Sequence, residues 1–224
     1  MDGICTETNI KQQNKSRSNA DIQQLSKKLS WLLRHGAAKE GLPIQPDGFL
    51  ATSAIFTHTK FKNYNIVILK KIVETDQKQR YTLRFNPNLG DYEIRANQGH
   101  SMEIVQSDSC LEKVTDSCAI ADIAHGTYYR FWPSIKTDGL LRKTRNHIHF
   151  TVMSDSPHTS KKVISGFRNN CEILIYIDTQ KAMKNGLEFY RSENNVILCE
   201  GQNGCISTQY FAKVLDRKTE FSDF

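Results

Sequence analysis

Apolar residues recur at helical spacing in two segments of the first half of the chain. In 21–35 the apolar positions follow one another at intervals of three and four residues, which predicts a helix with one apolar face, and Gly36 supplies a stop signal at its end. A second helix is expected over 64–75, where the same spacing recurs.

A strand and a tight turn follow the second helix. Residues 80–85 alternate between apolar and polar side chains, as a half-buried strand does, and 87–90 contain proline and glycine and are expected to turn the chain. Helices closed by a short hairpin within about 90 residues are typical of a winged-helix-like lobe, which is a common nucleic-acid binder.

After residue 91 the pattern changes to short alternating segments. Two short helices are expected near 131–138 and 179–185, the second capped by Asp178 and ended by Gly186. This half is therefore expected to be a mixed, β-rich lobe, and the whole chain an α+β protein. Strands are expected at 92–96, 124–128, 146–152, 172–178, 188–190, 196–199 and 210–214.

The chain length fits two lobes. With 224 residues, each lobe is able to bury a core of its own. We expect a polar, disordered tail at 1–20, the winged-helix-like lobe at 21–95 and the β-rich lobe at 96–218.

Composition narrows the class of protein. No apolar run approaches the roughly eighteen residues that span a bilayer, and 1–20 has no signal-peptide core, so we expect a cytoplasmic or nuclear protein that is neither secreted nor bound to a membrane. None of the six cysteines forms a CxxC pair, which favours reduced thiols over disulfides or structural zinc. The net charge of +6 suits an anionic partner and is equally compatible with ordinary solubility charge.

Two polar clusters have the chemistry of a phosphate site. Arg34 and His35 end the first helix. Cations there offset the helix dipole, but a fork-shaped guanidinium beside a titratable imidazole also makes a phosphate clamp with a proton donor. The second cluster, 94–101, follows a strand, and its polar and glycine positions belong either to a surface turn or to a phosphate or substrate contact.

Two clusters in the second half are open to similar pairs of interpretations. At 125–127 a glycine between histidine and threonine lets a ligand approach a strand closely, although a buried histidine satisfied by the backbone is the commoner arrangement. The stretch 165–168 ends in an arginine and is either a solvated basic face or a further cation that reaches a phosphate.

A histidine pair raises the question of a metal. In 146–150, strand alternation places His147 and His149 on one face and the two apolar residues between and after them on the other. Together with His125 or His100, this pair would supply three imidazole ligands for zinc. No carboxylate or cysteine completes the set, so we expect no metal.

In this order the motifs resemble the tRNA 2′-phosphotransferase family. The resemblance covers about residues 22–216, and although any one motif is weak, eight in the family's order are specific. Asp76, Gln77 and Phe167 depart from the family pattern without removing a functional group. The motifs are 25–36 (LSKKLSWLLRHG), 47–49 (DGF), 73–81 (VETDQKQRY), 94–101 (IRANQGHS), 125–127 (HGT), 139–140 (GL), 146–150 (NHIHF) and 165–168 (SGFR), followed by 204–206 and 210–211.

This resemblance implies a winged-helix RNA lobe followed by an ADP-ribosyltransferase-like lobe that binds NAD. It also implies a reaction in two steps. The internal 2′-phosphate of a spliced RNA attacks the anomeric carbon of the nicotinamide ribose and expels nicotinamide, which joins the RNA to ADP-ribose. The ribose 2″-hydroxyl then attacks the bridging phosphate and releases RNA with a free 2′-hydroxyl and ADP-ribose 1″,2″-cyclic phosphate. NAD is then a co-substrate, the partner is 2′-phosphorylated RNA such as a tRNA splice junction, no metal is needed, and the protein is expected to be a monomer.

The family motifs imply roles for individual residues. Both steps concentrate charge on one phosphate, which a set of arginines stabilises in the transition state. Arg34, Arg95 and Arg168 are expected to clamp that phosphate, and His35 to handle the proton of the second step. The residues expected at NAD are His125, Gly126, Thr127, Asn146 and His149, and those expected at the RNA are Lys27, Lys78, Arg80, Asn97, Gln98 and His100.

Three other functions fit parts of the sequence. An ADP-ribosyltransferase that modifies a terminal nucleic-acid phosphate or another acceptor would use the same arginines. A non-catalytic RNA-binding module would explain the first lobe but not the intact arginine set. A zinc-dependent hydrolase would need a metal that the ligand pattern does not support.

Overall fold

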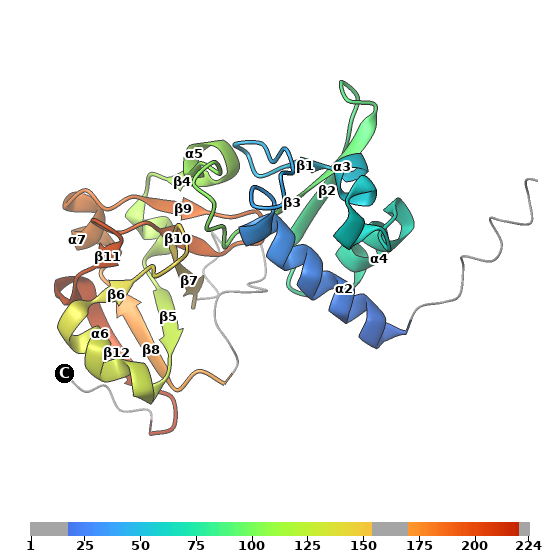
Figure 1. Cartoon of the computed structure of the whole chain (residues 1–224). Coiled ribbons are helices and arrows are strands. Elements are labelled where there is room, and N and C mark those ends of the chain that lie inside the picture. The colour runs from blue at the N-terminus through green and yellow to red at the C-terminus, as the bar shows by residue number, and fades with distance from the viewer. Residues whose placement is uncertain (1–17, 154–169, 220–224) are drawn as a thin grey trace, which may run out of the picture.

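The computed structural model describes residues 18–153 and 170–219, which form helices and three antiparallel sheets. Its α and β elements alternate irregularly along the chain rather than as repeated βαβ units, as Figure 1 shows. The expectation of an α+β protein is confirmed.

The first helix, α2 (Asn19–Trp31), begins with a capping box. The Ser18 hydroxyl accepts a hydrogen bond from the backbone N–H of Asp21, and the Asp21 carboxylate accepts one from the backbone N–H of Ser18. Residues 18–20, which we assigned to the polar tail, therefore cap and open the helix, and residues 1–17 lie outside the described part of the chain.

The last part of the predicted first helix is not α-helical. Leu32–Gly36 forms a π-helical turn, η1, in which the backbone N–H of Ala37 bonds to the carbonyl of Leu32 five residues earlier. The wider turn keeps Leu32 and Leu33 fully buried. Gly36 is the last residue of this turn rather than a simple stop, because a Cβ there would come within 2.6 Å of the Trp31 ring.

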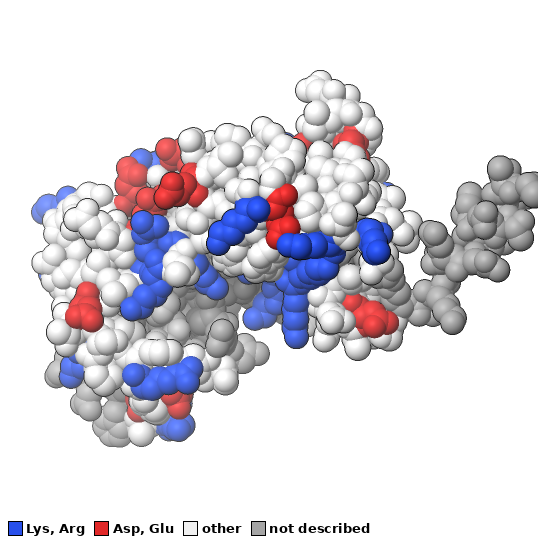
Figure 2. All heavy atoms as spheres, in the orientation of Figure 1, with Lys and Arg blue, Asp and Glu red and all other residues white. Residues whose placement is uncertain are grey.

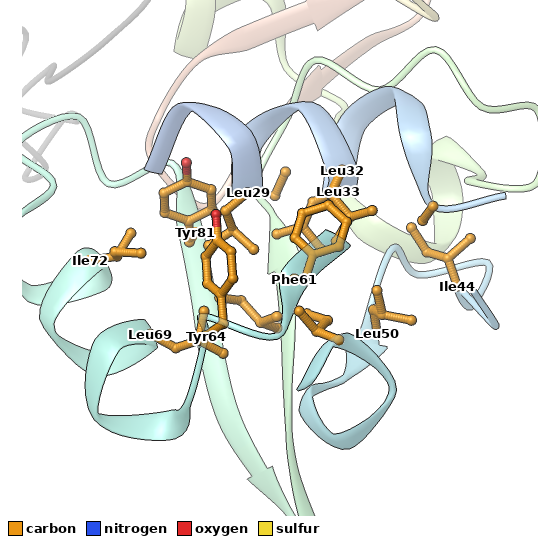
Figure 3. Close-up of a cluster of buried hydrophobic side chains, with 14 of the residues drawn as sticks. Leu29, Leu32, Leu33, Ile44, Leu50, Phe61, Tyr64, Leu69, Ile72 and Tyr81 are labelled. Atoms are coloured by element: carbon orange, nitrogen blue, oxygen red, sulfur yellow. The ribbon is translucent and has the colours of Figure 1, made fainter. Parts of the chain in front are cut away.

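The rest of the N-terminal part packs helices on a small sheet of order β1-β3-β2. Figure 3 shows its core, in which α2 and η1 contribute leucines that meet side chains from α4 and the hairpin. The predicted helix at 64–75 and strand at 80–85 are confirmed with small shifts at their ends. The elements are β1 (Leu50–Ala51), α3 (Thr52–Thr57), η2 (Thr59–Phe61), α4 (Ile66–Thr75), β2 (Tyr81–Asn86) and β3 (Asp91–Ala96).

The C-terminal part is built on a seven-stranded antiparallel sheet. Its order, β12-β8-β5-β7-β10-β9-β4, brings strands far apart in the sequence side by side. The elements are α5 (Ser107–Cys110), β4 (Glu112–Val114), η3 (Ser117–Ile120), β5 (Ile123–Thr127), η4 (Tyr129–Phe131), α6 (Trp132–Asp138), β6 (Leu140–Leu141), β7 (Ile148–Val152), β8 (Ile173–Ile177), α7 (Thr179–Lys184), β9 (Phe189–Arg191), β10 (Ile197–Cys199), β11 (Cys205–Ile206), η5 (Thr208–Tyr210) and β12 (Phe211–Asp216).

The strands and helices predicted for this half are present, with ends shifted by at most two residues. The Asp178 carboxylate accepts a hydrogen bond from the backbone N–H of Lys181 and so caps α7 as predicted, and Gly186 follows that helix in a left-handed conformation. No strand was expected at β4, β6 or β11, which are only two or three residues long.

Two large hydrophobic cores and two small clusters form among the described residues. The first includes residues from Ile22 to Val105, and the second residues from Val114 to Val214. The contacts between the parts that concern the site are polar: the Asn194 side chain donates to the carbonyl of Lys78 at 3.0 Å.

The described cysteines are Cys110, Cys118, Cys171, Cys199 and Cys205, and all five are free thiols, as expected. Cys5 lies outside the described residues. None of the helices in the described part of the chain is long and apolar enough to cross a membrane.

Candidate active site

A cavity of about 960 Å³ is lined by residues from both parts of the molecule. From the N-terminal part come Arg34 on η1 and polar residues of the β2–β3 region, and from the C-terminal part come residues of β5, β7 and the loops beside them. Sequence-predicted site residues that line this cavity are Arg34, Lys78, Arg80, Gln98, His125, Gly126, Thr127 and His149.

Arg34 is a cation held in a poorly solvated position. Its Nε is buried and has no hydrogen-bond partner among the described residues. Burial lowers the pKa of Arg34 to about 10, and nearby Arg145 acts in the same direction. A charged fork with an unused donor in a cavity is suited to an anion that accepts several hydrogen bonds.

His35 follows Arg34 in the π-helical turn, and its Nδ1 lies 2.8 Å from the Ser101 hydroxyl. Burial lowers the pKa of His35, and the adjacent Arg34 lowers it further. The imidazole is therefore neutral at neutral pH, and it is able to exchange a proton with a partner. His35 itself is not among the residues that line the cavity.

Arg95 on β3 is held by several groups outside the cavity lining. It donates from Nη1 to the carbonyl of Asp47 at 3.3 Å, pairs through Nη2 with the Glu193 carboxylate at 3.5 Å, and lies over the Phe49 ring. Its Nε is buried without a partner among the described residues, like that of Arg34. The structure thus does not place Arg95 on the same cavity wall as Arg34.

His100 lies close enough to Arg34 and Arg95 to feel the charge of both. It is only 4% exposed, and its Nε2 has no hydrogen-bond partner among the described residues. Burial lowers the pKa of His100 to about 3, and the charges of Arg34 and Arg95 contribute to the same shift. In this conformation the imidazole is neutral and has almost no surface to offer to RNA.

The depressed pKa of His100 predicts loss of stability in acid. The unfolded chain takes up a proton near pH 6.5 whereas the folded chain does not until about pH 3, so the stabilisation is complete above pH 6.5 and is lost as the pH falls toward 3. Between pH 7 and pH 4.5, protonation of this residue in the unfolded chain should lower the free energy of unfolding by about 2.7 kcal/mol. Urea unfolding of His100→Gln at both pH values should show a smaller loss of stability on acidification than the wild type. An equal loss in the two proteins would mean that the pKa of His100 is not lowered by burial.

Gly99 fits closely against Arg34. It has a φ of 87°, and a Cβ at this position would lie 3.3 Å from Arg34 Nε. Glycine is therefore required both for the left-handed backbone and for the approach of the guanidinium.

Gly99→Ala should displace Arg34 and strain the backbone. We expect a loss of about tenfold in activity, since small misplacements of a catalytic group are costly, with about 1–2 kcal/mol of destabilisation. Enzyme assays and thermal unfolding measure both effects. Gly90→Ala is the matched control, because Gly90 also has a positive φ but has open space around it; equal activity losses in the two variants would refute the link to Arg34.

The two cavity histidines of the sheet are linked to each other and to Gln98, which follows β3. The His125 Nδ1–H donates to the carbonyl of His149 at 2.9 Å, which leaves its Nε2 as an acceptor. His149 Nε2 lies 2.8 Å from the Gln98 side-chain oxygen and donates to it. Burial lowers the pKa of both histidines, so both are neutral hydrogen-bonding groups.

Strand β7 alternates as the sequence predicts. His147, just before the strand, and His149 line the cavity, while Phe150 belongs to the second core and Ile148 contributes to both. His147 Nε2 contacts the Ser107 hydroxyl at 2.9 Å. Within the described residues no group of three or more His, Cys, Asp or Glu side chains is arranged to hold a metal ion.

Several predicted residues lie elsewhere. Asn146 donates from its side chain to the carbonyls of Met102 and Val105 and lines a second, neighbouring pocket. Asn97 accepts from the Thr82 hydroxyl and donates to the carbonyl of Gln79, which makes it a buried brace of the turn before β2.

Two further predictions stand apart from the cavity. Lys27 is exposed on α2 and does not line the cavity. Arg168, with the rest of 165–168, lies outside the described residues.

Two groups of cavity residues were missed from the sequence. The loop 142–145 contributes Arg142, Lys143 and Arg145, and the segment 128–131 contributes two aromatic rings and a further arginine. The signal for the first was three cations in four residues, a pattern that usually marks a solvated face. The ion pair between Glu193 and Arg95 left no signal, because it joins separate parts of the chain.

Comparisons with known proteins agree with the motif pattern. A model of the RNA 2′-phosphotransferase, Tpt1 / KptA family matches residues 19–201. The tRNA 2′-phosphotransferase 1 of Danio rerio is 36% identical over 89% of this chain and 88% of its own length, and the tRNA 2′-phosphotransferase of Saccharomyces cerevisiae is 34% identical over 78% of this chain and 77% of its own. A Schizosaccharomyces pombe protein is 40% identical over 93% of this chain, which spans 55% of that relative.

Proposed function

The chain belongs to the RNA 2′-phosphotransferase family, and from this premise we propose that its large cavity is where an internal 2′-phosphate of spliced RNA is transferred to the ADP-ribose of NAD. It is an RNA 2′-phosphotransferase, an enzyme of the transferase class. The observation that carries the assignment of the site is Arg34, a desolvated cation with an unused Nε, in the same cavity as the linked histidines His125 and His149.

The cavity suits NAD in size and in chemistry. Its volume of about 960 Å³ is at the upper end of the range usual for small-molecule sites, roughly 300–1,000 Å³. His125 offers Nε2 to a ribose hydroxyl, and Thr127 offers a hydroxyl beside it on β5. Gly126 between them has no side chain to keep a ligand from the strand. When bound, NAD supplies an electrophilic ribose carbon with nicotinamide as its leaving group.

The arginines act on the phosphate that is transferred. Arg34 presents its fork to the phosphate oxygens, and we assign Arg95 and Arg168 to the same phosphate on the family motifs. These cations stabilise charge that accumulates in the transition state, which is the role a divalent metal ion plays in other phosphoryl transfers. Arg95 must exchange its contact with Glu193 for the phosphate, which the solvent-exposed Glu193 permits.

His35 moves the proton. Its lowered pKa keeps the imidazole neutral, and Ser101 fixes the ring through Nδ1, so that Nε2 is the nitrogen available for proton transfer. Because His35 directly follows Arg34, the same π-helical turn positions the group that transfers the proton and the group that binds the phosphate.

The two lobes divide the substrates. We assign 21–95 as a winged-helix-like lobe that binds RNA, in which Lys78 and Arg80 contact the RNA backbone. We assign 96–218 as an ADP-ribosyltransferase-like lobe that binds NAD. Lys78 and Arg80 line the cavity next to Arg34, as this division requires.

A single reaction tests the proposal. The protein is incubated with an RNA that carries one internal 2′-phosphate, with and without NAD, and the phosphate and the released nicotinamide are followed. We expect complete removal of the phosphate only with NAD, with one nicotinamide released for each phosphate. Removal without NAD would overturn the proposal, RNA that retains ADP-ribose would favour a transferase to another acceptor, and RNA binding without reaction would favour a silent binding module.

A further inference from the structure

A turn of the C-terminal part reaches across to the N-terminal part. This turn, 192–195, joins β9 to β10, and two of its side chains are almost fully buried, those of Ser192 and Asn194. The Ser192 hydroxyl donates to the side-chain oxygen of Asn194 at 2.9 Å, and the Asn194 amide donates to the carbonyl of Lys78 at 3.0 Å. Glu193 therefore lies between two anchored neighbours and is presented from a fixed turn.

The Glu193 carboxylate pairs with Arg95 across this boundary, at 3.5 Å from Nη2. Two other carboxylates that the chain brings to this region are engaged with a different arginine. Arg84 pairs through Nε with Glu93 and through Nη2 with Asp47. Among the described residues, Glu193 thus supplies the ion-pair partner of Arg95.

The two members of this pair differ in exposure. The Arg95 side chain is 13% exposed, whereas that of Glu193 is 58% exposed. Arg95 is also held by the Phe49 ring and by the carbonyl of Asp47. The guanidinium therefore has a fixed place, while the carboxylate is able to turn into solvent and leave that place to another anion.

The charges around Arg95 explain why a carboxylate lies there. Arg34 and Arg95 both lower the pKa of the same buried imidazole, that of His100, so the two cations act on one small region. Figure 2 shows further basic side chains over both parts of the molecule, which add to the positive field. Like charges held close together repel unless an anion offsets them. The Glu193 carboxylate offsets the charge of Arg95.

We propose that Glu193 is a positioning residue that acts through Arg95 and competes with the 2′-phosphate of the RNA for its guanidinium. Without RNA the carboxylate holds the guanidinium; when the phosphate binds, the carboxylate turns into solvent, and it returns when the product leaves. The exchange breaks no covalent bond. This proposal rests on the proposed function, because that function places the phosphate at Arg95.

The phosphate wins this exchange by its charge. A phosphate monoester carries about −1.5 to −2 charges at pH 7, more than a carboxylate, and its oxygens accept both donors of the guanidinium fork. A ligand that binds one state of a protein nevertheless loses apparent affinity in proportion to the fraction of molecules in the other state. Removing the carboxylate should therefore strengthen RNA binding, whereas removing a group that merely orients Arg95 would weaken it.

Fluorescence anisotropy of the full chain without NAD tests the competition. The probes are a short RNA with one internal 2′-phosphate and the same RNA with a 2′-hydroxyl. Glu193→Gln should bind the phosphorylated RNA about three- to fivefold more tightly than the wild type, since an ion pair with an exposed partner contributes up to about fivefold. The RNA with a 2′-hydroxyl should gain less. Inorganic phosphate should also displace the phosphorylated RNA at a lower concentration.

Steady-state and single-turnover kinetics provide a second measurement. The KM of Glu193→Gln for the phosphorylated RNA should fall by the same factor, without a gain in the single-turnover rate at saturating RNA and NAD, because the carboxylate acts on binding rather than on the transition state. Glu193→Asp keeps the charge and should restore most of the wild-type KM.

Two variants control for a general effect of charge. Glu188→Gln removes another exposed carboxylate, which pairs with Lys113 and does not line the large cavity, and it should leave RNA affinity unchanged. In an Arg95→Ala background, Glu193→Gln should have no further effect, because the cation through which it acts is gone.

The outcomes separate this inference from the proposed function. Unchanged or weaker binding of the phosphorylated RNA by Glu193→Gln would overturn the competition. A gain that is equal for both RNAs, that persists in the Arg95→Ala background or that also appears in Glu188→Gln would overturn it too. Failure of the wild-type protein to remove the 2′-phosphate with NAD would instead refute the proposed function, whereas the binding measurements need no NAD.

Discussion

Replacing Arg34 with alanine is expected to reduce 2′-phosphate transfer by about a thousandfold. The reason is that its guanidinium lies in the cavity with a buried donor that has no partner among the described residues. Loss of one preorganised donor to a transition-state oxyanion typically costs 10²–10³ in rate. The fold should not suffer, because the burial that lowers the Arg34 pKa to about 10 is a cost that alanine removes. The measurements are single-turnover transfer with saturating NAD, and thermal unfolding.

Arg34→Lys makes this test specific. Lysine keeps the charge but lacks the planar fork, so we expect it to recover only a small part of the rate. Lys184→Ala, which removes an exposed cation outside the cavity lining, serves as the control for net charge and should react like the wild type. Near-normal transfer by Arg34→Ala would contradict the clamp, and a large fall in its melting temperature would mean that Arg34 supports the fold instead.

Phe150→Ala is expected to destabilise the protein by about 3–5 kcal/mol, the usual cost of removing a fully buried phenylalanine. Phe150 lies on β7 with its ring packed against Phe189 and against the edge of the His125 imidazole, with centroids 6.3 and 6.0 Å away. A single domain is stable by only about 5–15 kcal/mol, so this is a large fraction of the total. Urea unfolding in the absence of ligands measures the change.

Phe150→Ala should also weaken NAD binding, because the Phe150 ring packs against the His125 imidazole. Phe131→Ala is the matched control: it makes the same substitution on a ring that is nearly half exposed, and its stability should stay within about 0.5 kcal/mol of wild type. If the two variants were equally stable, the second core would not be organised around β7.

The elements of the fold were predictable where periodicity was strong. Helix α4 and the hairpin β2–β3 show clear apolar spacing, and so do the longer strands of the large sheet. The order of that sheet was not predictable, because β5 lies between β7 and β8 through backbone pairing that no local pattern encodes. Strands as short as β6 and β11 contain too few residues to show an alternation.

The site was predictable to the extent that its motifs carry side-chain chemistry. Arg34, Gln98 and His125 meet in one cavity although they are widely separated in the sequence. His100 shows the limit of this reasoning. Its position in a polar run indicates a surface contact, but packing between the two lobes buries it, and only the tertiary structure reveals that.

The basic loop shows the opposite limit. A run of charged residues is usually solvated. Only the structure shows that 142–145 lines the same cavity as Arg34. In the sequence, Phe131 likewise resembles an ordinary residue beside a helix. Only the structure shows that its ring is exposed and lines the cavity.

The π-helical turn at Leu32–Gly36 has a consequence for how this site tolerates change. Such a turn is equivalent to one surplus residue in an α-helical spiral, and deleting that residue would let the helix close regularly. Regular closure would rotate the side chains that follow the deletion by about 100° and carry Arg34 away from the cavity. A deletion here would thus improve the regularity of the helix while destroying the enzyme, and selection for stability alone would remove the irregularity that activity requires.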